Sequence, residues 1–582
     1  MVAPLVKSRT SDVEFVKDPP RDLLRIAAAR AIPEEPTLLA RWNQIAEQTE
    51  RSEIFFTHQW SAAVASSYQE KLEPLFVLGY NGETLQAVAP LAIDSSTGVA
   101  QFLNANTADY CDFLSSSDLR SEFVGAVFSE LAKLQVKKLV LANIPKDSAT
   151  CSAVSAAVRN LGLHVLMRPA YDCAQVQLGS PSQRQQYQAT LYRRKMVRRY
   201  LRTLEKWGPV TVRHLTQWSQ VETSLPLFAQ MQVGRFLATG RISNLVREDR
   251  RFFLHNLAKR LTDAGWLSLS VLCVRERPIA WNYGFRFCGS WFWYQPTIDT
   301  EFEQLSPGFC LLSKILEEAC QNPEISRVDL GLGTEEYKLR VSNDVRRTVH
   351  LTVSDSLTVK KESVRFYSAH FVKKSPALER TIRSVLGRFG SFRHDILRMG
   401  TSTAVRSSMK NLRLRLEKED LYEVSECKTG PPQSETMTVA AVDLSMLAAT
   451  AMEYSEDEET LSSLLRGARW LREGMIGFAV VDSRRQPLSL CWFLPIRKYL
   501  RESELKQINA PTDAELSFEC WTAPRSSEQT SPNPIQLTVQ ERLRSGARIW
   551  VLGSVLKHAG AYSLEDCGLH KRLSVVQNRQ FR

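Results

Sequence analysis

Residues 266–274 (WLSLSVLCV), 279–287 (IAWNYGFRF) and 291–295 (WFWYQ) are three runs in which apolar side chains alternate with other residues. The charged segment 275–278 (RERP) joins the first two runs, and Gly289 precedes the third. Alternation with a period of two, enrichment in aromatic residues and turn residues between the runs together predict three antiparallel strands in a meander.

The sequence that follows the meander changes its periodicity. Ser306-Pro307-Gly308 directly precedes residues 309–319 (FCLLSKILEEA), whose apolar side chains recur at helical spacing. Serine with proline and glycine at the beginning of such a run predicts the start of a helix. A short strand is expected at residues 328–330, and it leads into residues 331–338 (GLGTEEYK), where two glycines precede two glutamates, a tyrosine and a lysine.

The meander, the Ser-Pro-Gly helix start and the pattern Asp-x-Gly-x-Gly-x-x-x-Tyr-Lys at residues 329–338 resemble the BioF2-like (CelD-type) acetyltransferase domain of the GNAT superfamily. That domain is itself similar to the FemABX aminoacyl transferases. The resemblance covers residues 191–349. It implies an α/β (α+β) fold with a mixed, mostly antiparallel sheet flanked by helices. It also implies an enzyme that moves an acyl group from a thioester, held beside a splayed pair of strands, to an amine.

The order of these features recurs along the chain. A hairpin expected at residues 75–91, around Asn81-Gly82, is matched by residues 267–285 and again by residues 477–492. A spacing of about two hundred residues predicts three tandem copies of one α/β unit, well above the periods of solenoid repeats. The alternative is that hairpins of this kind are common in unrelated α/β sequences.

The chain therefore divides into five predicted segments. They are a flexible N-terminal arm (1–38), a first GNAT-like domain (39–182), the BioF2-like GNAT domain (183–350), a basic helical linker (351–435) and a C-terminal GNAT-like domain (436–582). Because the outer copies lack a glycine-containing phosphate loop, we expect them to be non-catalytic and to shape the acceptor site.

Charge and cysteine usage limit the partners of the protein. Residues 360–415 contain fourteen Lys/Arg and three Asp/Glu, a net charge of +11 out of +12 for the whole chain. The basicity thus belongs to one segment, which is expected to bind an anionic membrane surface; no specific nucleic-acid binding is expected. Eleven cysteines without a Cys-x-x-Cys pair predict reduced thiols and no metal site. We expect a cytoplasmic protein, in part peripheral to the inner face of the membrane, because no apolar stretch is long enough to span it.

The candidate donor site is the helix start after the meander. A helix N-terminus binds pyrophosphate through its unpaired N–H groups and dipole, which predicts acyl-CoA binding by Gln304, Ser306, Pro307, Gly308, Phe309 and Cys310. The usual loop of the superfamily is Gln/Arg-x-x-Gly-x-Gly/Ala. Aligned on Gln304, its two small positions fall on Pro307 and Phe309. A CoA pyrophosphate would then be held less fully, or the donor is an aminoacyl-tRNA as in FemABX relatives. The alternative is an ordinary capped helix.

The candidate catalytic residues lie in the glycine-containing segment and on the third strand of the meander. Glu335 or Glu336 is suited to accept a proton from the attacking ammonium, and Tyr337 to return one to the leaving thiolate. Lys338 is suited to pair with a substrate phosphate. Gln295 is the polar residue among the aromatic residues of its strand and is expected at the acceptor site. The alternative places the glutamates on the surface and Tyr337 in the core.

Residues 191–202 (LYRRKMVRRYLR) form a second basic feature, which is either a solvated helix face or a docking site for an anionic substrate. The overall prediction is an N-acyltransferase that moves an acyl group, expected to be acetyl from acetyl-CoA, to an amino group of a sugar, nucleotide-sugar or cell-envelope (exopolysaccharide) precursor. Two alternatives stay open. One is aminoacyl transfer from tRNA, and the other is a non-catalytic scaffold that binds an anionic partner through residues 360–415.

Overall fold

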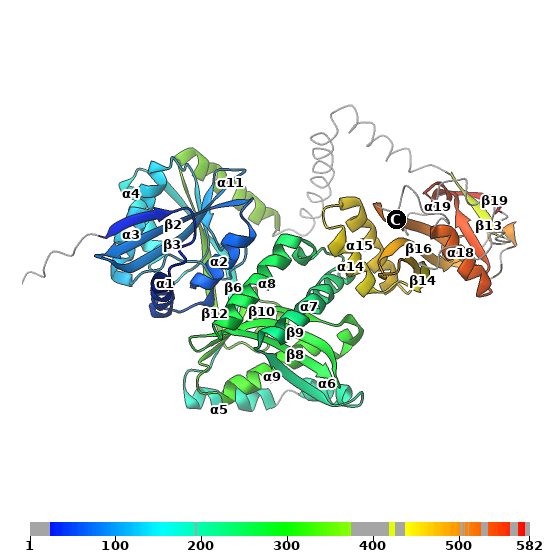
Figure 1. Cartoon of the computed structure of the whole chain (residues 1–582), viewed down its shortest axis with the longest axis horizontal. Coiled ribbons are helices and arrows are strands. Elements are labelled where there is room, and N and C mark those ends of the chain that lie inside the picture. Colours follow the sequence, from blue (N-terminus) through cyan, green and yellow to red (C-terminus); the bar gives the residue numbers. More distant parts are fainter. Residues whose placement is uncertain are drawn as a thin grey trace, which may run out of the picture. The chain divides into compact units, whose positions relative to one another are not determined.

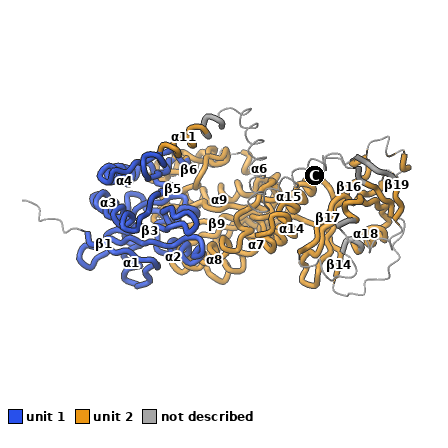
Figure 2. The backbone as a smooth tube through the Cα atoms, turned by 90° about the horizontal axis from the view of Figure 1, so that it is seen from above, with its two compact units in different colours: residues 1–171, 346–359 blue, residues 172–345, 360–582 orange. Residues whose placement is uncertain are grey.

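The structure is a computed structural model that describes residues 24–192, 195–373, 418–424, 437–500, 505, 507–509, 511, 513–524, 534–558 and 569–576. The chain forms two compact units, which are described one at a time (Figure 2). Unit 1 contains residues 1–171 and 346–359, and unit 2 contains residues 172–345 and 360–582.

Unit 1 is a mixed sheet with helices. Its elements are β1 (Arg25–Ala29), α1 (Pro36–Gln48), η1 (Ile54–Phe56), α2 (His58–Ser67), β2 (Leu72–Asn81), β3 (Thr84–Asp94), β4 (Ala100–Phe102), α3 (Ser117–Lys133), β5 (Leu139–Pro145), α4 (Thr150–Asn160), the first part of β6 (His164–Gln177) and most of β12 (Asp344–Ser354). The strand order is β1-β2-β3-β4-β5-β12-β6. The hairpin predicted around Asn81-Gly82 is β2–β3, and Gly82 has a φ of 58° there.

The predicted N-terminal arm is shorter than residues 1–38. Residues 25–29 form β1, which pairs antiparallel with β2 from Arg25↔Tyr80 to Ala29↔Phe76, and α1 begins at Pro36. Strand β1 thereby occupies an edge of β2 that would otherwise present unpaired backbone groups. The arm prediction is wrong for residues 25–38, and residues 1–23 lie outside the described residues.

The first part of unit 2 contains the predicted meander. Its elements are the second part of β6, α5 (Pro181–Tyr192), α6 (Lys195–Glu205), β7 (Val210–Leu215), α7 (Trp218–Ala238), η2 (Asn244–Val246), α8 (Glu248–Asp263), β8 (Leu267–Val274), β9 (Arg277–Phe287), β10 (Ser290–Ile298), η3 (Thr300–Leu305), α9 (Pro307–Gln321), β11 (Arg327–Leu332) and α10 (Glu336–Leu339). The strand order is β7-β8-β9-β10-β11-β6. Helices α7 and α8 lie on one face of this sheet, and α9 with α5 and α6 on the other (Figure 1).

The core of this part lies between the sheet and α9. It contains Trp291 and Trp293 of β10 and Leu311, Leu312 and Ile315 of α9, all at most 3% exposed. Each buried side chain of this size contributes about 1.5–3 kcal/mol. The helical spacing of the apolar residues after Gly308 therefore brings one face of α9 onto the sheet, as the sequence predicts.

The last part of unit 2 repeats the same order of elements. They are β13 (Lys418–Val424), β14 (Thr438–Ala441), α14 (Leu444–Glu453), α15 (Glu458–Arg472), β15 (Ile476–Val481), β16 (Pro487–Pro495), α16 (Ile496–Tyr499), β17 (Glu515–Thr522), α18 (Pro534–Arg544), β18 (Ile549–Leu552), α19 (Gly553–His558) and β19 (Leu569–Val576). The strand order is β14-β15-β16-β17-β18-β13-β19.

Three segments thus share one order of elements. Each has a strand, two helices and three strands, followed by a helix, a strand, a second helix and a last strand. These segments begin with β1, β7 and β14. We call them the first, middle and third copies. The predicted fold class of tandem GNAT-like α/β units is confirmed.

The predicted linker at residues 351–435 contains regular structure. Residues 356–373 form helix α11 (Ser356–Lys373), and β13 pairs antiparallel with both β18 and β19 of the third copy. Burial of Leu421 and Val424 holds β13 in that sheet, so the linker prediction is wrong for residues 418–424. Most of the basic segment 360–415 lies outside the described residues, which end at 373 on this side.

Two kinds of feature are absent from the described residues. No helix among them combines the length and the apolar content needed to cross a membrane. In the same residues, no group of three or more His, Cys, Asp or Glu side chains is arranged to hold a metal ion.

Candidate active site of the middle copy

The parallel strands β10 and β11 pair over only three residues. Ser290, Trp291 and Phe292 lie opposite residues 327–329, and the pairing then ends. Beyond Phe292 the register of β10 shifts, and β11 is irregular between Asp329 and Leu332. Two adjacent parallel strands that stop pairing leave backbone groups between them for another molecule. The resemblance to GNAT enzymes places the thioester at such a divergence.

A bulge in β10 opens the strand pair. On β9, Phe285 pairs with Phe292 and Tyr283 pairs with Gln295. Gly284 alone therefore faces Trp293 and Tyr294, so β10 has one extra residue. A Cβ atom at Gly284 would lie only 2.4 Å from the carbonyl oxygen of Phe292. The bulge therefore requires glycine at this position.

The bulge leaves buried polar atoms without partners. The side-chain Oε1 of Gln295 is buried and accepts no hydrogen bond from the described residues, and the same holds for Oδ1 of the neighbouring Asn282. A buried acceptor without a partner costs about 1–3 kcal/mol. Such atoms are the expected sites for a bound ligand or an ordered water molecule. The position of Gln295 at the acceptor site stays a prediction, as does its role.

The structure brings Tyr337 against the bulged strand. Tyr337 lies in α10, and its hydroxyl accepts a hydrogen bond of 3.4 Å from Nε1 of Trp293. Burial raises the pKa of Tyr337 above its ordinary value of 10.0, although neighbouring Lys338 and the Trp293 hydrogen bond act in the opposite direction. The phenol therefore keeps its proton at neutral pH. It can donate that proton to a group that becomes negative during a reaction.

Arg235 is a cation that the sequence does not single out. It lies on α7, more than a hundred residues before Tyr337, and its Nη1 donates to the carbonyl oxygen of Pro296 at 3.1 Å. Burial lowers the pKa of Arg235, and the charge of the guanidinium acts on Tyr337. The guanidinium is thus fixed at the end of β10, near the phenol. No local motif in α7 indicates this position.

Lys338 has partners within its own loop. Its side chain is 7% exposed, and Nζ donates to the carbonyl oxygen of Leu332 at 2.6 Å and pairs with Oε2 of Glu335 at 2.9 Å. These contacts close the segment that contains Gly331 and Gly333. The geometry gives Lys338 a positioning role in the loop, whereas the predicted contact with a substrate phosphate would require both contacts to break.

Glu336 lies at the surface. Its side chain is 82% exposed and forms an ion pair with Arg340, one helical turn away. The role of general base stays a prediction for Glu336 and equally for Glu335, whose side chain is 58% exposed. Because both carboxylates lie at the surface, either one can accept a proton only from an amine that reaches the rim of the site.

The start of α9 offers few free N–H groups. Ser306 has a left-handed backbone with φ 46°, and its carbonyl oxygen accepts hydrogen bonds from the amides of Phe309 (3.0 Å) and Cys310 (3.1 Å). Pro307 has no N–H group. Gly308 therefore carries the one amide of this first turn that makes no backbone hydrogen bond within the described part of the chain. A pyrophosphate would find one free amide here, fewer than a glycine-rich loop provides.

The other predicted donor-site residues separate into two environments. Cys310 is fully buried, its Sγ lies 3.7 Å from the carbonyl oxygen of Leu305, and burial raises the pKa of its thiol to about 12. Gln304 instead lines an open cavity of about 610 Å³ with Trp207 and Arg275. The structure thus keeps Ser306, Gly308 and Phe309 together at the helix start. It assigns Cys310 to the core and Gln304 to the neighbouring cavity.

The basic helix α6 has the two faces that its sequence predicts. Val197 and Leu204 are buried. The cations of residues 195–206 are exposed and have no ion-pair partner among the described residues: Lys195, Arg198, Arg199, Arg202 and Lys206. A solvated face explains this arrangement, and docking of an anionic substrate stays a prediction.

Comparison with known proteins assigns the middle copy to a family. Residues 192–339 match the family model described as an acetyltransferase (GNAT) domain. The resemblance to GNAT acetyltransferases is therefore confirmed for this segment. It is a domain of the GNAT type and resembles acyltransferases. No curated protein matches the chain.

Several solved structures are similar to the chain at low identity. FemX shares 10% identity, with 54% of this chain and 95% of FemX covered and a TM-score of 0.41. The C-terminal domain (DUF2156) of a putative lysylphosphatidylglycerol synthetase from Agrobacterium fabrum shares 12% identity, with coverages of 57% and 95% and a TM-score of 0.36. A GCN5-related glucosamine N-acetyltransferase region of a fungal multi-domain GH3 β-N-acetylglucosaminidase shares 10% identity, with coverages of 57% and 38% and a TM-score of 0.31.

Proposed function

We propose that the middle copy is an N-acyltransferase that moves an acyl group, acetyl in the simplest case, from acyl-CoA to an amino group. The observation that carries the proposal is the position of the Tyr337 hydroxyl against Trp293, at the point where β10 and β11 stop pairing. The family match supports acyl transfer as the reaction class. The proposed acceptor is an amino group of a sugar, nucleotide-sugar or cell-envelope precursor.

The residues present support a short reaction sequence. The amine nitrogen attacks the carbonyl carbon of the thioester, so that a C–N bond forms and the C–S bond breaks. Tyr337 gives its proton to the departing thiolate, and the ammonium loses a proton to Glu336, to Glu335 or to water. Because burial keeps Tyr337 protonated, the acid is ready at neutral pH. Arg235 stabilises negative charge that develops near the phenol.

One observation favours a second candidate, aminoacyl transfer from tRNA. In the first turn of α9, Gly308 carries the one amide without a backbone hydrogen bond to any described residue, which is a poor cradle for the pyrophosphate of CoA. The exposed cations of α6 suit a polyanionic donor better than a small one. This donor would use the same strand divergence and the same Tyr337 proton.

Thermal unfolding in the presence of each donor tests the two candidates. Acetyl-CoA at a hundredfold excess over its Kd should stabilise the native protein by about 2.7 kcal/mol. Gly308→Asp places a carboxylate against the phosphates and should weaken CoA binding at least tenfold. Gly308→Ala is the matched control, because any Cβ at this position lies 3.1 Å from Cγ2 of Ile298. Stabilisation by aminoacyl-tRNA and by none of a panel of acyl-CoAs would reject acyl-CoA as the donor.

A further proposal concerns the basic segment 360–415, which we propose binds anionic membrane surfaces. Its net charge of +11 supports this proposal. Flotation with anionic vesicles at low and high salt, comparing the full chain with a deletion of residues 360–415, tests it. Equal flotation of both proteins would reject it.

A further inference from the structure

The third copy repeats the strand divergence of the middle copy. Strands β17 and β18 pair in parallel over residues 515–517 and 549–551, again three residues. The pairing of β17 with β16 then shifts register so that Phe518 is the extra residue, and β18 passes into α19 at Gly553. The third copy therefore has the same opening between parallel strands, followed by a bulge, although its sequence predicts no catalytic role.

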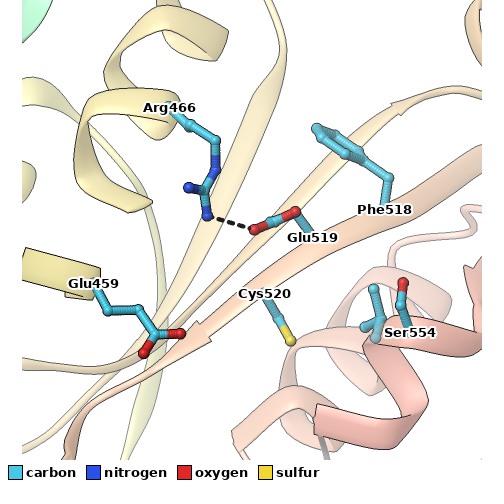
Figure 3. A pocket seen from close by; sticks show the side chains of 7 residues that line it. Glu459, Arg466, Phe518, Glu519, Cys520 and Ser554 are labelled. Atoms are coloured by element: carbon cyan, nitrogen blue, oxygen red, sulfur yellow. Dashed lines mark hydrogen bonds and ion pairs between the residues drawn. The ribbon is translucent and has the colours of Figure 1, made fainter. Parts of the chain in front are cut away.

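A cavity of about 320 Å³ lies at this opening. Its walls come from α15, from the bulged part of β17 and from the start of α19 (Figure 3). The lining residues are Glu459, Arg466, Phe518, Glu519, Cys520, Ser554 and Val555. A cavity of this size accommodates a small polar molecule such as a monosaccharide or an amino acid.

The charges around the cavity do not cancel. Nη2 of Arg466 lies 2.8 Å from Oε1 of Glu519, so these two side chains neutralise each other. Glu459 also lines the cavity, and its carboxylate has no partner within the part of the chain that the structure describes. Burial raises the pKa of the Cys520 thiol well above its ordinary value, so this thiol stays neutral. Among the described lining residues, the exposed Glu459 carries the one charge without an ion-pair partner.

The sequence of the third copy also disfavours a phosphate-bearing ligand. Residues 523–533, which connect β17 to α18, contain no glycine, so the sequence lacks the loop that would let backbone approach a phosphate. A carboxylate without a partner would also repel a phosphate. An acyl-CoA or nucleotide is thus a poor occupant of this cavity, and a cationic ligand is a good one.

We propose that the third copy binds a small polar molecule through its protonated amino group, which pairs with Glu459, while hydroxyl or carboxylate groups of the ligand face the Arg466–Glu519 pair and Ser554. The site does not depend on the function proposed for the middle copy. Its ligand class is a primary amine on a polar framework. An amino sugar and an amino acid both carry this group, so the experiment must separate them.

Calorimetric titration of the full chain tests the proposal, with glucosamine and lysine as amine probes. Glucose and N-acetylglucosamine are the matched sugars without the positive charge. At least one amine probe should bind, and both neutral sugars should bind at least tenfold more weakly. Binding of glucosamine alone identifies an amino sugar, and binding of lysine alone identifies an amino acid. Failure of both amines to bind, or equal binding of the neutral sugars, would overturn the proposal.

Three variants locate the binding. Glu459→Gln keeps the shape of the side chain, removes the charge and should weaken amine binding at least tenfold. Glu456→Gln, at an exposed acidic residue outside the lining, should leave binding unchanged. Arg466→Gln exposes the charge of Glu519 and should preserve or strengthen the binding of glucosamine. It should weaken the binding of lysine, whose carboxylate loses the guanidinium. Unchanged binding by Glu459→Gln, with the fold intact by circular dichroism, would place the amine elsewhere.

Discussion

Nζ of Lys338 lies 2.6 Å from the carbonyl oxygen of Leu332, inside the loop that carries the two glycines. This single contact changes the role of the Tyr-Lys pair. The lysine fixes the loop, and only the tyrosine faces the diverging strands. The loop and α10 together then determine where the phenol of Tyr337 is held.

Replacing Lys338 with methionine should therefore destabilise the protein more than it affects substrate affinity. The carbonyl of Leu332 loses its donor, which predicts a loss of about 1–3 kcal/mol in the free energy of unfolding. Urea unfolding at 25 °C measures this loss. Lys314→Met is the matched control, because Lys314 also pairs with a glutamate three residues away at 2.9 Å but is 40% exposed. A surface pair of this kind contributes about 0.2–1 kcal/mol.

A substrate-binding role of Lys338 would give a different result in the same variant. If Lys338→Met unfolds at the wild-type urea concentration while the apparent KM of one phosphate-bearing substrate rises, the lysine leaves its loop to bind that substrate. The contact with Leu332 would then be a resting arrangement.

Replacing Gln295 should reduce activity without reducing stability, in contrast to the replacement of Lys338. Oε1 of Gln295 is buried and accepts no hydrogen bond from the residues that the structure describes, so Gln295→Met removes an unsatisfied acceptor and keeps most of the side-chain volume. We expect unchanged stability or a gain of up to about 1 kcal/mol, together with at least a tenfold loss of turnover. Thermal unfolding and steady-state kinetics on the same preparation measure both effects. A destabilised variant with normal turnover would identify Gln295 as a structural residue.

Glu318 predicts a pH dependence of stability. Its carboxylate accepts hydrogen bonds from His214 (2.7 Å) and Arg286 (2.7 Å), and these, with His214 first, lower its pKa below 4.5. A depressed folded-state pKa stabilises the protein above the unfolded-state pKa, and this stability is lost as the pH falls through the folded-state value. Glu318→Gln should therefore cost about 1 kcal/mol at pH 7, since the hydrogen bonds are charge-assisted but partly exposed.

The difference between wild type and Glu318→Gln should shrink as the pH is lowered below 4.5. Urea unfolding at several pH values between neutral and acidic measures it. Glu317→Gln, next in sequence on the same helix, controls for the loss of one negative charge. A difference that stays constant down to acidic pH would show that the Glu318 carboxylate does not titrate with folding.

The local elements of the middle copy follow from its sequence, because alternation and helical spacing are properties of neighbouring residues. The meander and the helix start before Phe309 are formed as predicted. The sequence also contains a signal for the bulge. Gly284 interrupts an aromatic strand, which is typical of a β-bulge or a close backbone approach. A glycine inside a strand thus marked the position where β10 and β11 part.

The partners of the site residues do not follow from the sequence. Residue types indicate that Lys338 is a cation, but only the fold determines that its nearest oxygen belongs to Leu332. Arg235 comes near Tyr337 because α7 packs on β10, and no spacing along the chain encodes that distance. Strand β13 lies within the predicted linker (351–435), and a seven-residue strand needs its neighbours in the sheet to be recognised.

The most direct prediction concerns the proton of Tyr337. Tyr337→Phe keeps the ring and removes the hydroxyl, so turnover should fall about 10²-fold if this phenol is the general acid. Donor binding, measured by calorimetry, should stay near the wild-type value. Since burial raises the pKa of Tyr337 above 10.0, turnover that depends on its proton should persist through pH 9 and decline only at higher pH.

The control for this variant is Tyr200→Phe. Tyr200 packs against the same core from α6, so its loss tests whether any removed hydroxyl impairs the enzyme. Loss of the alkaline decline in Tyr337→Phe can be interpreted only against this control. The pH profile is therefore recorded for wild type, Tyr337→Phe and Tyr200→Phe alike. Normal turnover of Tyr337→Phe with an unchanged profile would make Tyr337 a packing residue. The proton donor would then have to be sought among the groups that face the bulge.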